Sequence, residues 1–139
     1  MFIHFSPTHL IFNSLWIYIL GREIEQLDGK IIFIFLILFA SISSNYLQYS
    51  FSGPSLFGGL SGVVYGLLGY CFVSETFLRI NKFSFPPAIY IFMFVWLLIG
   101  FTGFLDLLGF GEIANFAHLG GLLSGILSGY IFSMYNKKT

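Results

Sequence analysis

Four polar side chains that could do chemistry stand inside long apolar runs of this sequence. Ser61 supplies a hydroxyl, which becomes a nucleophile when a neighbouring base takes its proton, and His118 supplies an imidazole that can act as such a base. His9 and Asn13 lie four positions apart, so both fall on one face of a helix, about one turn from each other. These groups can work together only if the fold brings them to one place.

The composition places these apolar runs in a membrane. The chain has 139 residues, of which 57% are hydrophobic and 9% are charged, and its formal net charge is zero. Soluble domains contain about 25% charged residues. The same numbers exclude a disordered chain, a basic nucleic-acid-binding protein and, because Cys71 is the only cysteine, a secreted module held by disulfides. We therefore expect a polytopic membrane protein that forms one domain.

Charged residues and turn residues divide the apolar runs into five expected spans. A helix needs about 20 residues to cross a bilayer, so a chain of this length holds at most about six spans. Ser6 followed by Pro7 is typical of a helix start, and Gly21 is expected to end the first helix. The expected spans cover residues 7–20, 31–49, 61–76, 87–105 and 113–134. The expected fold class is all-α, a polytopic bundle of membrane helices.

All six basic residues fall on one side of such a five-span bundle. They are Arg22, Lys30, Arg79, Lys82, Lys137 and Lys138. Cytoplasmic loops carry an excess of Lys and Arg, so this side is expected to face the cytoplasm. The C-terminus is then inside and the start of the chain is outside.

The short third span sets the expected depth of Ser61. A helix of about 16 residues is about 24 Å long, which is less than the hydrocarbon thickness of about 30 Å. If this helix ends at the cytoplasmic face, Ser61 lies below the outer surface, and the Gly-rich loop before it dips into the membrane. His9, Asn13, Asn115 and His118 also lie near the outer ends of their helices, so these groups can meet at a similar depth.

Glycines recur on one stripe of the third span and on one stripe of the fifth. They are Gly62, Gly66 and Gly69 in the third span, and Gly121, Gly125 and Gly129 in the fifth. Stripes of small residues let transmembrane backbones approach closely, and alone they indicate ordinary helix packing. If these two stripes pack together, Ser61 comes within hydrogen-bond reach of His118.

Three short motifs resemble those of a known family. Residues 59–62 read G-L-S-G, residues 117–121 read A-H-L-G-G, and residues 9–13 read H-L-I-F-N, with His4 and Phe5 before them. They resemble the G-x-S-G, A-H-x-x-G and H-x-x-x-N motifs of rhomboid intramembrane serine proteases, and their order resembles the bacterial GlpG-type members. The first motif alone is a weak signal, but all three in order on alternate spans form a strong one.

The resemblance implies roles for the polar residues around Ser61. Ser61 is the expected nucleophile and His118 its general base. They are expected to act as a dyad, because no Asp or Glu is placed to orient the His118 imidazole: Glu112 and Asp106 lie outside, at least one turn away. Tyr65, one turn below Ser61, is expected to stack on the imidazole instead. Asn115 is a supporting residue one turn before His118.

The resemblance also implies where an oxyanion would bind. The backbone N–H of Ser61 and the side chains of His9 and Asn13 are the expected donors. Gly59 and Leu60 are expected to shape the turn that presents them. No cofactor and no metal are expected.

The expected substrates are other transmembrane proteins. A nucleophile below the outer surface reaches peptide bonds near the outer end of a neighbouring helix, and the bond must first be unwound. The resemblance implies single-pass substrates that enter beside the aromatic pair Phe12 and Trp96, in a bacterial inner membrane, with lipids as the other partners. Family members have six core spans, so residues 1–139 are interpreted as a rhomboid-like domain without the first span and most of the first outer loop.

Three other interpretations start from the same residues. A metal site of His4, His9 and His118 is disfavoured, because His4 and His9 do not share a helix face and no H-E-x-x-H motif is present. A small transporter is disfavoured because no buried charge is available to couple to an ion. The remaining alternative is a catalytically inactive rhomboid-like protein that binds membrane helices, or a truncated relic.

Overall fold

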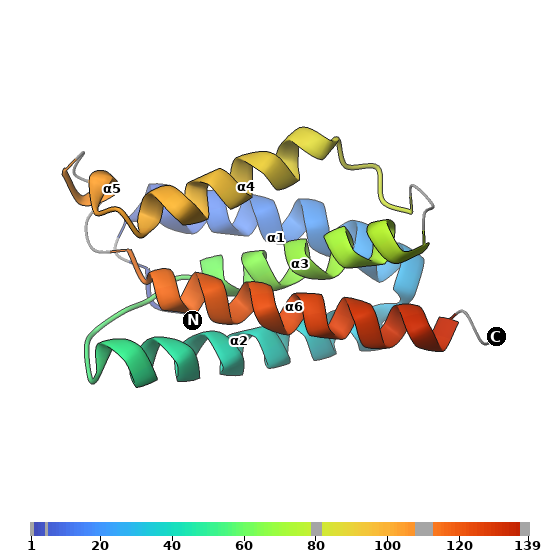
Figure 1. The fold of residues 1–139 in the computed structure, drawn as a ribbon, viewed down its shortest axis with the longest axis horizontal. Helices are drawn as coiled ribbons and strands as arrows, with labels where there is room; N and C mark the ends of the chain where they lie inside the picture. Colours follow the sequence, from blue (N-terminus) through green and yellow to red (C-terminus); the bar gives the residue numbers. More distant parts are fainter. Residues whose placement is uncertain (1, 5, 79–81, 108–112, 137–139) are drawn as a thin grey trace.

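The computed structural model describes residues 2–4, 6–78, 82–107 and 113–136. These residues form helices joined by short loops, without a strand, so the expected all-α fold class is confirmed for them. The long helices run side by side along the length of the molecule (Figure 1). The helices are α1 (Pro7–Asp28), α2 (Lys30–Ser52), α3 (Ser61–Leu78), α4 (Pro87–Gly100), α5 (Phe104–Leu107) and α6 (Asn115–Asn136).

Helix α1 begins as predicted and ends later than predicted. The Ser6 side chain accepts a hydrogen bond from the His9 backbone N–H, and Pro7 occupies the first turn. The expected end at Gly21 is wrong, because the helix continues for about two more turns. Gly21 is buried inside the helix, where a Cβ would lie 2.6 Å from the Phe33 ring of α2. Its missing side chain serves close packing of α1 on α2.

Helix α4 is shorter than the expected span 87–105. It ends at Gly100, and a turn follows in which the Thr102 hydroxyl donates to the Ile99 carbonyl at 2.6 Å. Gly103 then adopts a φ of +72°, which favours glycine, before the single turn of α5. The expected start of the last span at 113 also moves, because α6 begins at Asn115.

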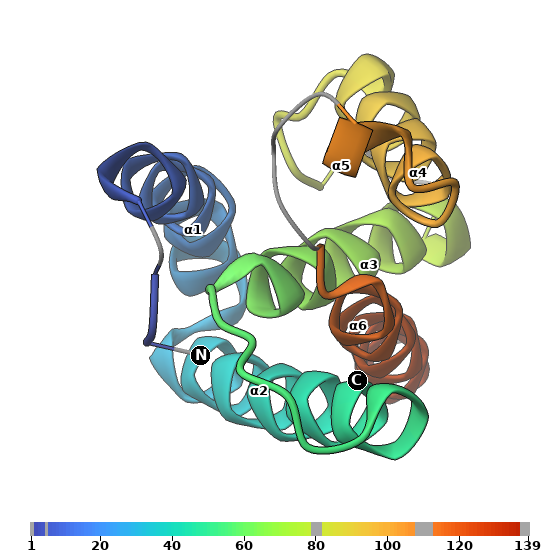
Figure 2. The ribbon, with the colours of Figure 1, turned by 90° about the vertical axis from the view of Figure 1, so that its left-hand side faces the viewer.

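Helix α3 forms the centre of the bundle. α1, α2, α4 and α6 surround it when the molecule is viewed from its end (Figure 2). Its residues 62–71 are all buried, and Leu67 and Cys71 have no exposed surface. Its glycines Gly62, Gly66 and Gly69 let neighbouring helices approach it closely. The start of α3 lies further into the bundle than the neighbouring ends of α2 and α4 (Figure 1).

The predicted glycine stripes pack α3 against α6. The carbonyl oxygens of Gly62 and Gly66 occupy the space that a Cβ at Gly121 and Gly125 would need. A Cβ at Gly69 would in turn lie 2.7 Å from the Leu122 carbonyl oxygen. The two backbones therefore touch over several turns, as the sequence pattern predicts.

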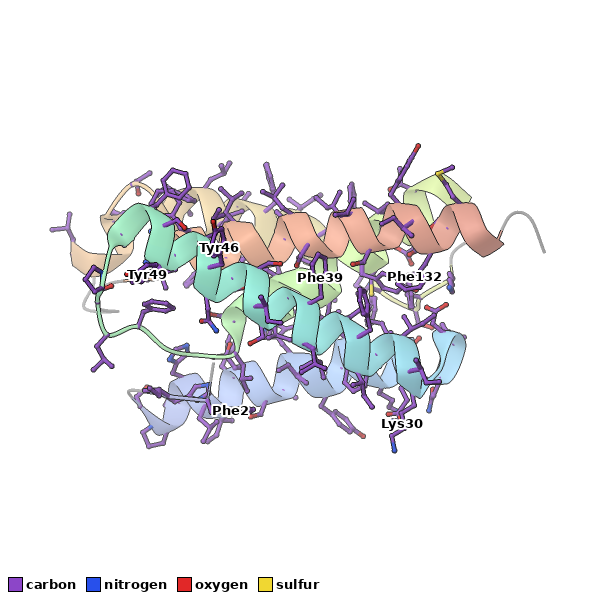
Figure 3. All side chains as sticks on the ribbon, turned by 90° about the horizontal axis from the view of Figure 1, so that it is seen from below. Phe2, Lys30, Phe39, Tyr46, Tyr49 and Phe132 are labelled. Carbon is purple, nitrogen blue, oxygen red and sulfur yellow. The ribbon has the colours of Figure 1, made fainter. Side chains whose placement is uncertain are left out.

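The outside of the bundle is apolar. Among the described residues, α2 and residues Asn115–Met134 of α6 are long and apolar enough to cross a membrane, and α4 is apolar but shorter. The exposed face of α2 carries Tyr46 and Tyr49 toward one end and Lys30 at the other (Figure 3). Aromatic residues at one membrane interface and basic residues at the cytoplasmic interface are typical of membrane helices.

Candidate active site

Ser61 and His118 meet where the N-terminal ends of α3 and α6 lie against each other. A hydrogen bond of 2.7 Å joins Ser61 Oγ and His118 Nε2. His118 is 7% exposed and Ser61 is half-buried, so the pair is sheltered but open on one side. The proximity predicted from the glycine stripes is therefore present, because Gly62 and Gly121 let the two helix ends approach.

Tyr65, one turn after Ser61 on α3, packs against the His118 imidazole. The centroids of its ring and of the His118 ring are 4.8 Å apart, and the planes are inclined by 31°. The Tyr65 hydroxyl donates a hydrogen bond of 2.9 Å to the Met93 carbonyl of α4. Among the hydrogen bonds of the described residues, none joins His118 to a carboxylate. The side chains of Glu112 and Asp106 lie outside the described part of the chain.

The loop before Ser61 packs directly on α1. Gly59 has a φ of +110°, and a Cβ on it would lie 2.8 Å from His9 Cε1 and 3.6 Å from Asn13 Nδ2. Glycine at this position thus allows both the backbone conformation and the close approach. The approach brings His9 and Asn13 beside the turn that carries the Ser61 hydroxyl.

Asn13 holds a buried donor without a partner. The side chain is 3% exposed, and its Nδ2 has no hydrogen-bond partner among the described residues. Buried polar groups are nearly always hydrogen-bonded, so such an exception calls for a ligand or a water. The amide is available to an acceptor that arrives between α1 and the Gly59 turn.

His4 supports the Gly59–Leu60 turn, a contact that the sequence did not predict. Its Nδ1 donates to the Phe2 carbonyl at 3.1 Å, so its Nε2 can accept the Leu60 backbone N–H at 3.4 Å. The His4 and His9 rings pack edge to face at 5.1 Å. The sequence pointed to His4 only as a residue that precedes the H-L-I-F-N motif, without a partner in this turn. Its neighbour Phe5 lies outside the described residues.

Helix α2 contributes polar groups that were also not predicted. Gln48 Oε1 accepts the Ala117 backbone N–H at 3.0 Å, which holds the residue before His118. A small cavity beside Ser61 is lined by Ser41, Ser44 and Asn45 of α2, and the Ser44 Oγ has no partner among the described residues. The spacing of four between Ser44 and Gln48 is the signal that could have revealed this face.

Asn115, predicted as a supporting residue, and Phe12 and Trp96, predicted beside the substrate entry, make contacts away from the Ser61–His118 bond. Asn115 instead donates to the Gly100 carbonyl at 2.8 Å and fastens α4 to α6. Phe12 packs edge to face on Trp16 of its own helix, with ring centroids 6.1 Å apart. Trp96 lies 5.9 Å from the Phe92 ring on α4.

The described residues contain no group of three or more His, Cys, Asp or Glu side chains that could hold a metal ion. The arrangement instead offers a hydroxyl bonded to an imidazole, an unpartnered amide donor nearby and a small polar cavity. Such a set can carry out acyl transfer through a serine ester.

Comparison with known proteins adds an independent finding. Residues 1–135 match the family model described as Rhomboid domain. The chain is 40% identical over 129 residues to a protein of Serratia proteamaculans named Rhomboid protease GlpG. It is 37% identical over 138 residues to the protein of the same name from Haemophilus influenzae, and 34% identical over 137 residues to that from Klebsiella pneumoniae.

These matches cover most of this chain and less of the relatives. They span 93%, 99% and 99% of this chain, respectively. They span 45% of the Serratia protein, 69% of the Haemophilus protein and 48% of the Klebsiella protein. The chain thus spans about half the length of most of the curated relatives that it matches.

Proposed function

Since this chain belongs to the rhomboid family, we propose that it is an intramembrane serine endopeptidase in which Ser61 and His118 act as a dyad. The observation that carries the proposal is the hydrogen bond of 2.7 Å between Ser61 Oγ and His118 Nε2, formed within a bundle of apolar helices. Relatives named Rhomboid protease support the same activity.

The dyad accounts for both halves of peptide hydrolysis. His118 Nε2 takes the hydroxyl proton while Ser61 Oγ forms a bond to the peptide carbonyl carbon. The imidazolium then gives this proton to the leaving nitrogen as the C–N bond breaks, and an acyl ester remains on Ser61. His118 next takes a proton from a water whose oxygen attacks the carbonyl carbon of the ester. The bond between this carbon and Ser61 Oγ then breaks, His118 returns the proton to Ser61 Oγ, and the carboxylic product leaves. The small cavity beside Ser61 supports this step, since Ser41, Ser44 and Asn45 line part of it and can bind a water.

The proposed oxyanion site lies between α3 and α1. The Ser61 backbone N–H, the His9 ring and Asn13 Nδ2 are the proposed donors, and the close packing of Gly59 on His9 and Asn13 supports this set. Donors held in place before the reaction stabilise the developing charge without having to reorganise. Gly59 and Leu60 shape the turn, and His4 holds it through the Leu60 N–H.

The proposed substrates are single-pass transmembrane proteins cut near the outer membrane face. Tyr65 is proposed to take the place of a carboxylate by stacking on the imidazole. Phe12 on α1 and Trp96 on α4 are proposed to border the entry of the substrate from the bilayer, since these two helices lie on either side of α3 (Figure 2). The proposed membrane is the bacterial inner membrane, with Arg22, Lys30 and Lys82 on the cytoplasmic side.

Labelling of the purified chain in lipid nanodiscs by a fluorophosphonate probe tests the function. We expect labelling of the wild-type chain, none of Ser61→Ala, and wild-type labelling of the control Ser50→Ala, whose hydroxyl is bonded to the Tyr46 carbonyl of α2. Cleavage of a purified single-pass substrate should follow the same order. Equal labelling of the wild type and Ser61→Ala, or labelling of neither, contradicts the dyad. Binding of the substrate helix without labelling would instead indicate an inactive helix-binding protein.

A further inference from the structure

Helix α4 lies at the edge of the bundle, and most of its residues are not buried. Only Met93, Leu97 and Gly100 of its 14 residues are buried. No Cα atom of α4 lies within 8 Å of a Cα atom of α1 among the described residues. In Figure 1, α4 is the outermost of the long helices on its side of the bundle. The apolar contact of α4 with the core is limited to one face, where Met93 and Leu97 are buried.

Three side-chain hydrogen bonds fasten α4 at three heights. Near its start, the Tyr90 hydroxyl donates to Glu75 Oε2 at 2.8 Å. In its middle, Tyr65 donates to the Met93 carbonyl at 2.9 Å. At its end, Asn115 donates to the Gly100 carbonyl at 2.8 Å.

The middle bond belongs to the residue that stacks on the imidazole. The Tyr65 hydroxyl donates a hydrogen bond to the Met93 carbonyl of α4. The centroids of the Tyr65 and His118 rings are 4.8 Å apart, and His118 is hydrogen-bonded to Ser61. A continuous chain of contacts therefore runs from the backbone of α4 to the Ser61 hydroxyl. Tyr65 is 2% exposed, so its ring has little freedom to turn without moving one of these partners.

We propose that Tyr65 is a positioning residue through which the placement of α4 sets the orientation of the His118 imidazole. The basis is that the buried Tyr65 side chain contacts both α4 and this imidazole. This inference rests on the proposed function and adds to it a dependence of the dyad on α4. A displacement of α4, such as an entering substrate helix would cause, then reaches the imidazole by way of the Tyr65 ring.

A double-mutant cycle between Tyr65→Phe and Tyr90→Phe tests the coupling. Tyr65→Phe keeps the ring and removes the bond to α4. Tyr90→Phe keeps its ring and loosens the start of α4, where its partner Glu75 lies near the opposite end of α3 from Ser61. The readout is the rate at which a small fluorophosphonate labels Ser61 in nanodiscs, since such a probe does not need α4 to move aside. Melting temperatures of all four proteins are measured alongside.

We expect Tyr90→Phe to slow labelling by about threefold or more in the wild-type background and to leave the rate unchanged in the Tyr65→Phe background. Tyr65→Phe alone is expected to slow labelling as well, because the ring is no longer held from α4. An equal factor for Tyr90→Phe in both backgrounds, or no effect in either, overturns the coupling. A purely structural role would lower melting temperatures without this dependence of one variant on the other.

A second readout separates this proposal from the proposed function. The ring proton resonances of His118 in isotope-labelled protein report its stacking on Tyr65 whether or not the chain is catalytic. They should shift with Tyr90→Phe in the wild-type background and stay fixed with Tyr90→Phe in the Tyr65→Phe background. Absence of labelling together with this shift pattern contradicts the dyad alone, and unaltered resonances contradict the coupling alone.

Discussion

At the scale of single residues, Asn13 shows how burial and function can oppose each other. Its amide nitrogen is buried and lacks a partner among the described residues, and a buried donor that stays unsatisfied generally costs a folded state about 1–3 kcal/mol. A residue kept for packing alone would be apolar at this place. A residue kept for an oxyanion has a reason to bear this cost, because its donor is free until the reaction supplies an acceptor.

Replacing Asn13 by leucine separates these two readings. We expect Asn13→Leu to slow fluorophosphonate labelling about 100- to 1000-fold, the usual effect of losing one oxyanion donor. We also expect its thermal stability to equal or exceed that of the wild type, because an unsatisfied buried group is removed. Ser14→Ala, the exposed next residue of α1, is the control and should change neither value. Loss of stability with unchanged labelling would show that Asn13 is structural.

The pairing of Ser61 with His118 could be predicted, whereas the partner of Asn115 could not. Two glycine stripes that end beside these two residues leave one close arrangement of the helices, and the observed bond follows from it. Asn115 was expected to support the dyad because it lies one turn before His118. Its actual partner, the Gly100 carbonyl, is a helix end, and the sequence predicted that helix to continue to 105.

At the scale of elements, a glycine can end a helix or lie inside it where another helix packs closely, and the sequence alone does not separate these two roles. Gly21 was predicted to end α1, because it precedes a charged stretch and glycine often follows a helix. In the structure Gly21 lies inside α1, beside the Phe33 ring of α2. Gly29, with a φ of +93°, ends α1 instead. The distinction depends on the packing partner of each glycine.

The glycine contact between α3 and α6 yields a prediction on stability. A methyl group at Gly125 would occupy the space of the Gly66 carbonyl oxygen, which is backbone and cannot turn away. We expect Gly125→Ala to lower the free energy of unfolding by about 1–3 kcal/mol, as overpacking does. Unfolding in mixed detergent micelles measures the change. Leu127→Ala, half exposed on the same helix, is the control and should cost much less. If Gly125→Ala and Leu127→Ala lower the free energy of unfolding equally, α3 and α6 accommodate the added methyl group without overpacking.

At the scale of the whole molecule, polar groups gather at both ends of an otherwise apolar bundle. One end holds the proposed dyad. At the other end, Lys82 of the loop before α4 forms an ion pair with Asp28, the last residue of α1. Glu75 of α3 lies at this end and accepts the Phe83 backbone N–H at 3.2 Å. The sequence placed Asp28 and Lys82 in two separate loops, so only the assembled bundle reveals that they meet.

This ion pair should stabilise the bundle mainly by neutralising a buried charge. The Asp28 side chain is 3% exposed and that of Lys82 is 18% exposed, so removal of Lys82 leaves a carboxylate with little access to water. We expect Lys82→Met to destabilise the fold by about 3 kcal/mol. The double variant Asp28→Asn, Lys82→Met should recover most of that loss, because the uncompensated charge is gone. Unfolding in mixed micelles measures the two variants together with the wild type. If the double variant is less stable than Lys82→Met, Asp28 stabilises the bundle through contacts other than this pair.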